Sequence, residues 1–202
     1  MPHIDELIDQ IRVLEEEMQA EYDKKRDDFE FVVGQRRIQF SREVTLLQRQ
    51  SRSGLLRYVT GASWLMWLTA PLIYIGLVPM LLLDAYIFVY QTLCFPVYGI
   101  QKAKRSDYVI LDRGDLPYLN AVEKLNCAYC GYGNGLAAYF REVSARTEQY
   151  WCPIKHARRI VAAHDRYPGF LEYGDAVNYQ LGLERLRGAL RQARDESLVV
   201  AP

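Results

Sequence analysis

The sequence predicts a mainly α-helical protein: a membrane helical hairpin flanked by amphipathic helices, with a small cytoplasmic metal-knuckle domain. Three observations support this fold class. Residues 61–100 contain a single charged side chain, Asp84, in a chain that is 25% charged. The segments on either side repeat apolar residues at helical spacing. Four side chains of types that bind metals follow the apolar segment, namely Cys127, Cys130, Cys152 and His156.

The charge distribution divides the N-terminal part of the chain into an acidic and a basic segment. The 25 basic and 25 acidic side chains cancel, so the net charge offers no argument for a nucleic-acid partner. Residues 1–30 nevertheless hold 11 acidic and 4 basic side chains, and residues 31–60 hold 6 basic and 1 acidic. The acidic start lacks the apolar core of a secretory signal, so we expect metal binding or free thiols rather than disulfides.

The apolar segment, residues 62–100, is about twice as long as the roughly 20 residues that one membrane span requires. Gly76 and Pro79 lie at its middle and predict a turn between two helices, 59–77 and 80–98. Asp84 is then expected near the far membrane interface. A re-entrant hairpin and a soluble buried hairpin are the alternatives. Basic residues stand on both sides of the segment and predict an inner (cytoplasmic) membrane protein with both termini in the cytoplasm: Arg49, Arg52 and Arg57 before it, Lys102, Lys104 and Arg105 after it.

The flanking segments predict amphipathic helices and one short strand. Residues 3–33 repeat apolar side chains every three or four positions, which is typical of a helix packed on its own domain or of a coiled-coil arm. A basic helix is expected at 41–57 and another amphipathic helix at 175–193. Residues 108–111 predict a strand. The expected organisation is therefore helices in 1–57, the hairpin in 58–100 and the metal-knuckle domain in 101–202.

The four candidate ligands occur as two pairs with spacings suited to one metal ion. Cys127 and Cys130 form a C-x2-C pair, and Gly131 after it predicts a tight turn. Cys152 precedes Pro153, which predicts a helix starting there and His156 one turn along it. A helix over 136–150 would return the chain between the pairs. Three cysteines and one histidine form a closed zinc site in many proteins, so zinc is the expected metal.

The string from Cys127 to Tyr132 resembles the first knuckle of rubredoxins and related knuckle domains, and Cys152-Pro153 resembles the start of their second knuckle. Lys155 stands where that pattern has its fourth cysteine, which disfavours a four-thiolate iron site. The C-x3-H ending is also similar to that of two-iron two-sulfur proteins with three cysteines and one histidine. The whole chain looks like an uncharacterised group of bacterial membrane proteins with C-x-Y-C and C-P-I-K-H segments, a resemblance that implies no activity.

These patterns predict a membrane-anchored accessory or scaffold subunit with a structural zinc site. Its expected partners are the lipid bilayer and a membrane protein complex or a second copy, bound through the amphipathic helices. The alternative is an electron-transfer protein with iron or an iron–sulfur cluster at the same four ligands. A membrane-tethered nucleic-acid binder is disfavoured because the knuckle domain lacks a basic stripe. No catalytic triad or Cys-His nucleophile pattern is evident, so an enzyme is the less favoured class.

Overall fold

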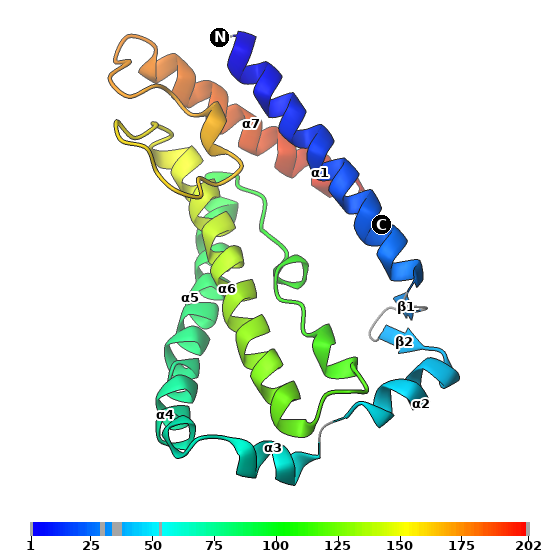
Figure 1. The fold of residues 1–202 in the computed structure, drawn as a ribbon. Helices are drawn as coiled ribbons and strands as arrows, with labels where there is room; N and C mark the ends of the chain where they lie inside the picture. Colours follow the sequence, from blue (N-terminus) through cyan, green and yellow to red (C-terminus); the bar gives the residue numbers. More distant parts are fainter. Residues whose placement is uncertain (1, 29–30, 34–37, 53, 201–202) are drawn as a thin grey trace. The chain divides into compact units, whose positions relative to one another are not determined.

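The computed structural model describes residues 2–28, 31–33, 38–52 and 54–200, and confirms that the protein is mainly α-helical (Figure 1). It divides into two compact units, one made of residues 1–61 and 112–125, the other of 62–111 and 126–202. The boundary expected after residue 57 falls within α3 (Leu55–Gly61), and the one expected after residue 100 falls inside the second unit.

The first unit contains the N-terminal helices and a small hairpin. Helix α1 (Pro2–Asp28) ends earlier than the expected 3–33, and Gly34 lies outside the described residues. Strands β1 (Phe31–Val33) and β2 (Ile38–Phe40) pair antiparallel. Helix α2 (Arg42–Gln50) begins after Ser41, whose hydroxyl accepts a hydrogen bond from the Val44 amide at 3.3 Å. The expected basic helix 41–57 is thus two shorter helices, α2 and α3.

Helix α6 (Ala121–Trp151) has its start in the first unit, and a capping box fixes that start. The Asn120 side-chain oxygen accepts hydrogen bonds from the amides of Val122 and Glu123, both at 3.0 Å. The Glu123 carboxylate accepts one from the Asn120 amide at 2.8 Å. This reciprocal pairing satisfies amides that a helix start leaves without intrahelical partners.

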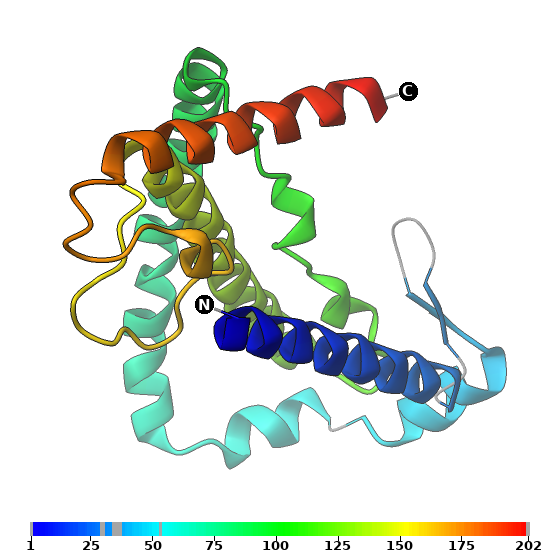
Figure 2. The same ribbon diagram turned by 90° about the horizontal axis from the view of Figure 1, so that it is seen from above.

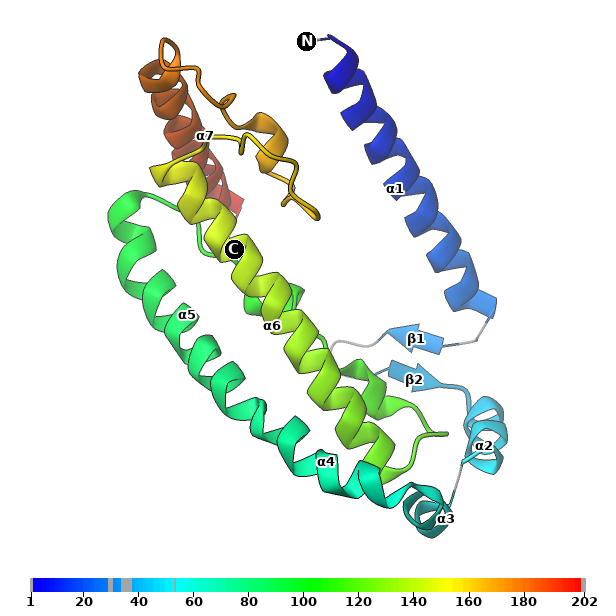
Figure 3. The ribbon, with the colours of Figure 1, turned by 60° about the vertical axis from the view of Figure 1, so that its left-hand side comes forward.

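The expected hairpin between residues 59 and 98 is wrong, because the chain does not reverse at Gly76. Helices α4 (Trp64–Ile75) and α5 (Leu77–Tyr98) are separated only by Gly76, whose φ of −60° and ψ of −16° are helical. The two form one long apolar helix, Trp64–Tyr98, and follow a single curved path (Figure 3). Pro79 lacks an amide hydrogen and Gly76 lacks a side chain, so together they bend the helix instead of ending it.

In the second unit, α6 continues beside α5 and runs in the same direction (Figure 3). The Tyr129 hydroxyl donates to the Ile73 carbonyl, and Gln91, later in α5, donates to the hydroxyl of Tyr139. Two parallel neighbouring helices need a returning connection, and residues 99–111 begin it. They include the short 3₁₀ helix η1 (Arg105–Asp107). Residues 108–111, where a strand was expected, belong to this irregular connector.

Glycines let the connector pass close to α6. A Cβ built on Gly135 would lie 2.6 Å from the Tyr108 carbonyl oxygen and 2.9 Å from the Val109 Cα. Gly131 faces Ile110 and Leu111 at ordinary contact distance, one turn earlier in α6. Gly131 was expected in the turn of a metal knuckle. Both glycines instead belong to α6, and Gly135 gives the connector backbone room to approach it.

The C-terminal part of the chain closes the core of this unit. Helix α7 (Tyr179–Val200), expected over 175–193, crosses the C-terminal end of α6 (Figure 2). The Gln149 side chain donates to the Leu186 carbonyl at 3.0 Å. The core joins apolar side chains from α5, the connector, α6 and α7: Ile87, Phe95, Ile100, Ala103, Tyr132, Leu136, Tyr139, Val143 and Leu190.

Candidate membrane-binding surface

The feature that distinguishes this structure is an exposed apolar face along α4 and α5. One set of its side chains recurs every three or four residues, with a single interval of seven between Ile75 and Leu82, and so forms a stripe along the helix. Further exposed apolar side chains lie beside this stripe, namely Met66, Ile73, Val78, Leu81 and Phe88. We call this stripe the α4–α5 face. Its nine large side chains are all at least half exposed: Leu65, Leu68, Leu72, Ile75, Leu82, Tyr86, Val89, Leu93 and Val97. Among the described residues, Trp64–Tyr98 is the one helix long and apolar enough to cross a membrane. Only 6% of its most apolar 18-residue stretch is buried inside the protein.

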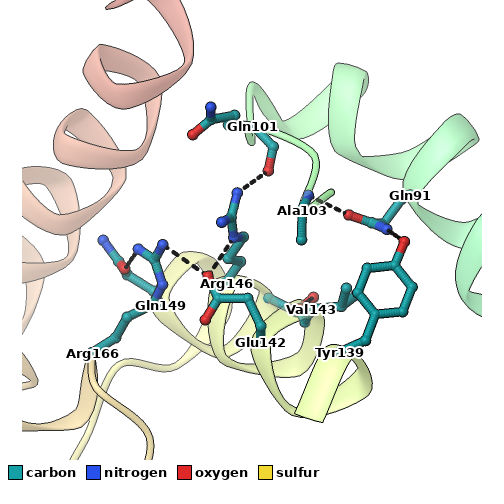
Figure 4. Close-up of polar contacts among 10 residues, drawn as sticks. Gln91, Gln101, Ala103, Tyr139, Glu142, Val143, Arg146, Gln149 and Arg166 are labelled. Atoms are coloured by element: carbon teal, nitrogen blue, oxygen red, sulfur yellow. Dashed lines mark hydrogen bonds and ion pairs between the residues drawn. The ribbon is translucent and has the colours of Figure 1, made fainter. Parts of the chain in front are cut away.

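The opposite side of α5 is buried and partly polar. Ile87 and Phe95 are fully buried in the core. Gln91, also buried, donates to the Tyr139 hydroxyl at 2.5 Å and accepts from the Ala103 amide at 2.7 Å (Figure 4). One amide side chain thereby joins α5, α6 and the connector, so α5 has a definite inner side and a definite outer side.

Asp84 belongs to the inner side rather than to the far end of a membrane hairpin. Its carboxylate accepts hydrogen bonds from Arg105 of the connector, the shortest at 2.8 Å, and from the Tyr132 hydroxyl of α6 at 2.9 Å. A paired carboxylate facing the protein explains why the one charge in the apolar segment is tolerated. It also places the charged connector beside the middle of α5.

A second polar cluster joins the rest of this unit to the C-terminal half of α6. The Glu142 carboxylate accepts from Arg146 at 2.7 Å and from Arg166 at 3.1 Å (Figure 4). Arg146 also donates to the Gln101 carbonyl at 2.6 Å, and Arg166 donates to the Gln149 side chain at 2.8 Å. The connector, α6 and the loop before α7 therefore meet at one carboxylate.

The environment of Glu142 changes its acidity. Burial by itself would raise the pKa of this carboxyl, but the hydrogen bond from Arg146 and the positive charge of Arg166 outweigh burial. The pKa of Glu142 consequently lies below its ordinary value. The carboxylate is thus ionised at neutral pH and holds both arginines.

The structure does not form the metal knuckle expected at Cys127 and Cys130. Both cysteines lie inside α6, where the tight turn was expected, and their thiols are free. The residues around them explain the difference: Ala128, Leu136 and Ala137 favour helix, and the capping box at Asn120 starts the helix before the first cysteine.

Cys152 and His156 lie at the other end of the same helix. Cys152 follows the last residue of α6, and the chain after it is extended, not helical. Ile154 forms a parallel bridge with Leu171. The His156 amide donates to the Tyr167 hydroxyl at 2.6 Å. The helix expected to start at Pro153 is therefore absent, and His156 contacts an aromatic loop residue.

The four candidate ligands therefore do not converge on one point. The 24 residues that follow Cys127 in α6 extend about 36 Å along the helix axis. The thiolates of one tetrahedral zinc lie only about 4 Å apart, because each Zn–S bond is about 2.3 Å long. Within the described part of the chain, no group of three or more His, Cys, Asp or Glu side chains is arranged to hold a metal ion. In this conformation the residues do not fit a shared zinc, iron or iron–sulfur centre.

Comparison with known proteins adds no family to these findings. No family model, curated protein or solved structure matches the chain. The resemblances to rubredoxin knuckles and to a bacterial membrane-protein group accordingly stay predictions.

Proposed function

We propose that this protein is a membrane-attached accessory protein that binds the bilayer through the α4–α5 face. The observation that supports the proposal is the length and exposure of that face. Monomeric soluble proteins seldom expose apolar patches larger than a few hundred Å². Half-burying a large apolar side chain is worth roughly 1 kcal/mol, so the nine side chains of the face together offer a substantial driving force.

The chemistry of the face favours lipid over a protein partner. Protein interfaces carry about one hydrogen bond per 100–200 Å². Of the nine side chains of the α4–α5 face, only Tyr86 has a polar atom. Trp64 and Trp67 stand at one end of the helix and are also exposed, as is common for aromatic residues at a membrane interface.

Charge provides a second membrane-binding signal. In the sequence, Arg49, Arg52 and Arg57 precede the helix, while Lys102 and Lys104 follow it. A basic residue near an anionic membrane surface contributes about 1 kcal/mol. Stable attachment usually needs two signals, and an apolar face with basic flanks supplies both.

The accessory role is proposed from α1, which belongs to the other unit. Its exposed side chains Leu7, Ile11, Leu14, Met18 and Tyr22 recur every three or four residues. The rest of the helix is strongly acidic. This pattern suits pairing with a basic amphipathic helix of a partner protein, because two acidic copies would repel each other. The electron-transfer alternative has no geometric support, because the four ligands lie apart.

Vesicle flotation tests the membrane proposal. Detergent-purified protein is mixed with vesicles of phosphatidylcholine and phosphatidylglycerol at a ratio of about 70:30, and bound protein is measured as the vesicles float. The wild type should float, and the pair Leu72→Glu with Leu82→Glu should lower the partition constant by roughly tenfold or more, since lost burial and a desolvated charge act together. Leu181→Glu is the matched control, because Leu181 is an equally exposed leucine on α7, at 77%.

Failure of the wild type to float would refute membrane attachment. If the same two substitutions instead dissolve an oligomer seen by light scattering, the α4–α5 face is an interface between copies. If Leu181→Glu lowers flotation as much as the double substitution, binding is a nonspecific response to surface charge.

A further inference from the structure

We infer that the helix Trp64–Tyr98 lies in the plane of the membrane surface, with only the α4–α5 face in contact with hydrocarbon, instead of crossing the bilayer. This inference rests on the membrane attachment proposed above and specifies its geometry. The apolar content of the segment fits a crossing helix and an in-plane helix equally well. The packing on its other side distinguishes them.

The two sides of the helix have different surroundings. The exposed stripe runs along both α4 and α5, while the opposite side of α5 contacts the connector and α6. A helix that crosses the bilayer beside protein has lipid on one side and other helices on the other, joined by close packing and hydrogen bonds. Here the inner side carries buried Gln91 and the Asp84–Arg105 pair. Beside the apolar core residues Ile87 and Phe95, these polar groups bond to the connector, and an in-plane position leaves them outside the hydrocarbon core.

The connector accompanies α5 and is irregular apart from the short 3₁₀ helix η1. Arg105 pairs with Asp84, and the Ala103 amide pairs with Gln91, so residues 103–105 lie beside the middle of α5. Lys102 and Lys104 are exposed there. A crossing α5 would draw these charges and irregular backbone into hydrocarbon, where exposed irregular backbone does not occur.

The helix is also longer than the hydrocarbon core is thick. Thirty-five helical residues extend about 52 Å, whereas the hydrocarbon core is about 30 Å thick. The whole helix would need a tilt of about 55° to fit inside, beyond the usual range of 0–40°. The uncharged stretch 62–83 alone has a suitable length, but Tyr129 and Asn126 of α6 bond to Ile73 and Tyr74 along it. Ile110 and Leu111 of the connector contact α6 at Gly131, two residues beyond Tyr129.

Fluorophore depth in the bilayer tests the inference. Single cysteines replace Leu72, Leu82 or Leu93 in a chain whose four native cysteines are changed to serine. Each is labelled with an environment-sensitive dye and bound to the same 70:30 vesicles, and quenching by lipids spin-labelled at different depths is measured. The in-plane helix predicts one shallow depth for all three, about 5–10 Å below the headgroups. Residues 72 and 93 are separated by about 30 Å of helix axis, so a crossing helix would place them at clearly different depths.

Proteolysis of the unmodified protein supplies an independent measurement, should the cysteine-free chain fold poorly. Trypsin added outside intact vesicles should cut both before the helix, at Arg57, and after it, at Lys102 or Lys104. Protection of one side until detergent is added would show a crossing helix and overturn the inference. Depths that differ by more than about 10 Å, or a much deeper Leu82 label as a hairpin predicts, would overturn it as well.

These outcomes are separable from failure of the proposed function. A protein that floats with vesicles but shows unequal depths retains membrane attachment and loses the in-plane geometry. A protein that does not float, and whose labels show no change in emission on adding vesicles, loses the proposed function itself.

Discussion

Replacing Gly135 by alanine should lower the free energy of unfolding, even though alanine favours helix. The new Cβ would lie 2.6 Å from the Tyr108 carbonyl oxygen and 2.9 Å from the Val109 Cα, both backbone atoms. The connector would have to withdraw until these distances reach about 3.4 Å, which strains its attachment at Gln91. Overpacking costs roughly 1–3 kcal/mol, and the helix propensity of alanine returns about 1 kcal/mol. We expect a net loss of up to about 2 kcal/mol.

Gly188→Ala is the matched control for this substitution. Gly188 lies inside α7, and a Cβ built on it meets nothing within 4 Å. The control should therefore raise stability by about 0.5–1 kcal/mol. Thermal unfolding followed by circular dichroism in one detergent gives both values on the same scale. If Gly135→Ala melts at or above the wild-type temperature, as Gly188→Ala should, the connector does not pass close to α6 as described.

Three further predictions concern other parts of the molecule. Glu142→Gln should lower the free energy of unfolding at pH 7 and should also make that free energy fall less steeply in acid. A carboxyl with a depressed pKa contributes its full stabilisation above its unfolded pKa of about 4.5, and the contribution is lost as pH falls through the folded pKa. Equal acid slopes for the variant and the wild type would contradict this. Asn120→Ala should lower the free energy of unfolding by about 1 kcal/mol in the same melts, because it removes the cap of α6. Asn120→Ser should retain most of that free energy. Equal losses in the two variants would show that the cap contributes nothing. Cys127→Ser combined with Cys152→Ser should change the free energy of unfolding by no more than about 0.5 kcal/mol and should leave the metal content unchanged. Elemental analysis measures the metal content. If the wild type holds one zinc per chain and the variant holds none, α6 breaks to form the expected site.

Local patterns in the sequence predicted the helices well where one periodicity continues without interruption. The apolar repeat near the C-terminus predicted α7, and the N-terminal repeat predicted most of α1. The same reasoning failed at Gly76 and Pro79, because a turn residue marks a position where a helix can bend as well as end. A turn in the far aqueous phase needs polar residues, and the Gly-Leu-Val-Pro string has none.

The predicted metal site shows a different limit of sequence reasoning. Ligand spacing such as C-x2-C suits a knuckle turn, but it also places two thiols on one face of a helix. The residues that decide between them lie outside the motif. Asn120 and Glu123 form a capping box whose pattern was present in the sequence, and they start a helix that continues past both cysteines. Gln91 and its connector contact had no local signal, because that hydrogen bond joins residues from separate elements.

Hydropathy alone cannot decide how an apolar helix meets a membrane, because it averages over all sides of the helix. The decision depends on what packs against the side that does not face lipid. On α5 that side carries a paired carboxylate and a buried amide, both bonded to an irregular connector with exposed lysines. Moving α5 into hydrocarbon would mean moving the connector as well or breaking these bonds, and each paired polar group left alone there costs several kcal/mol. The proposed in-plane position would keep every one of these bonds and would still place the α4–α5 face in lipid.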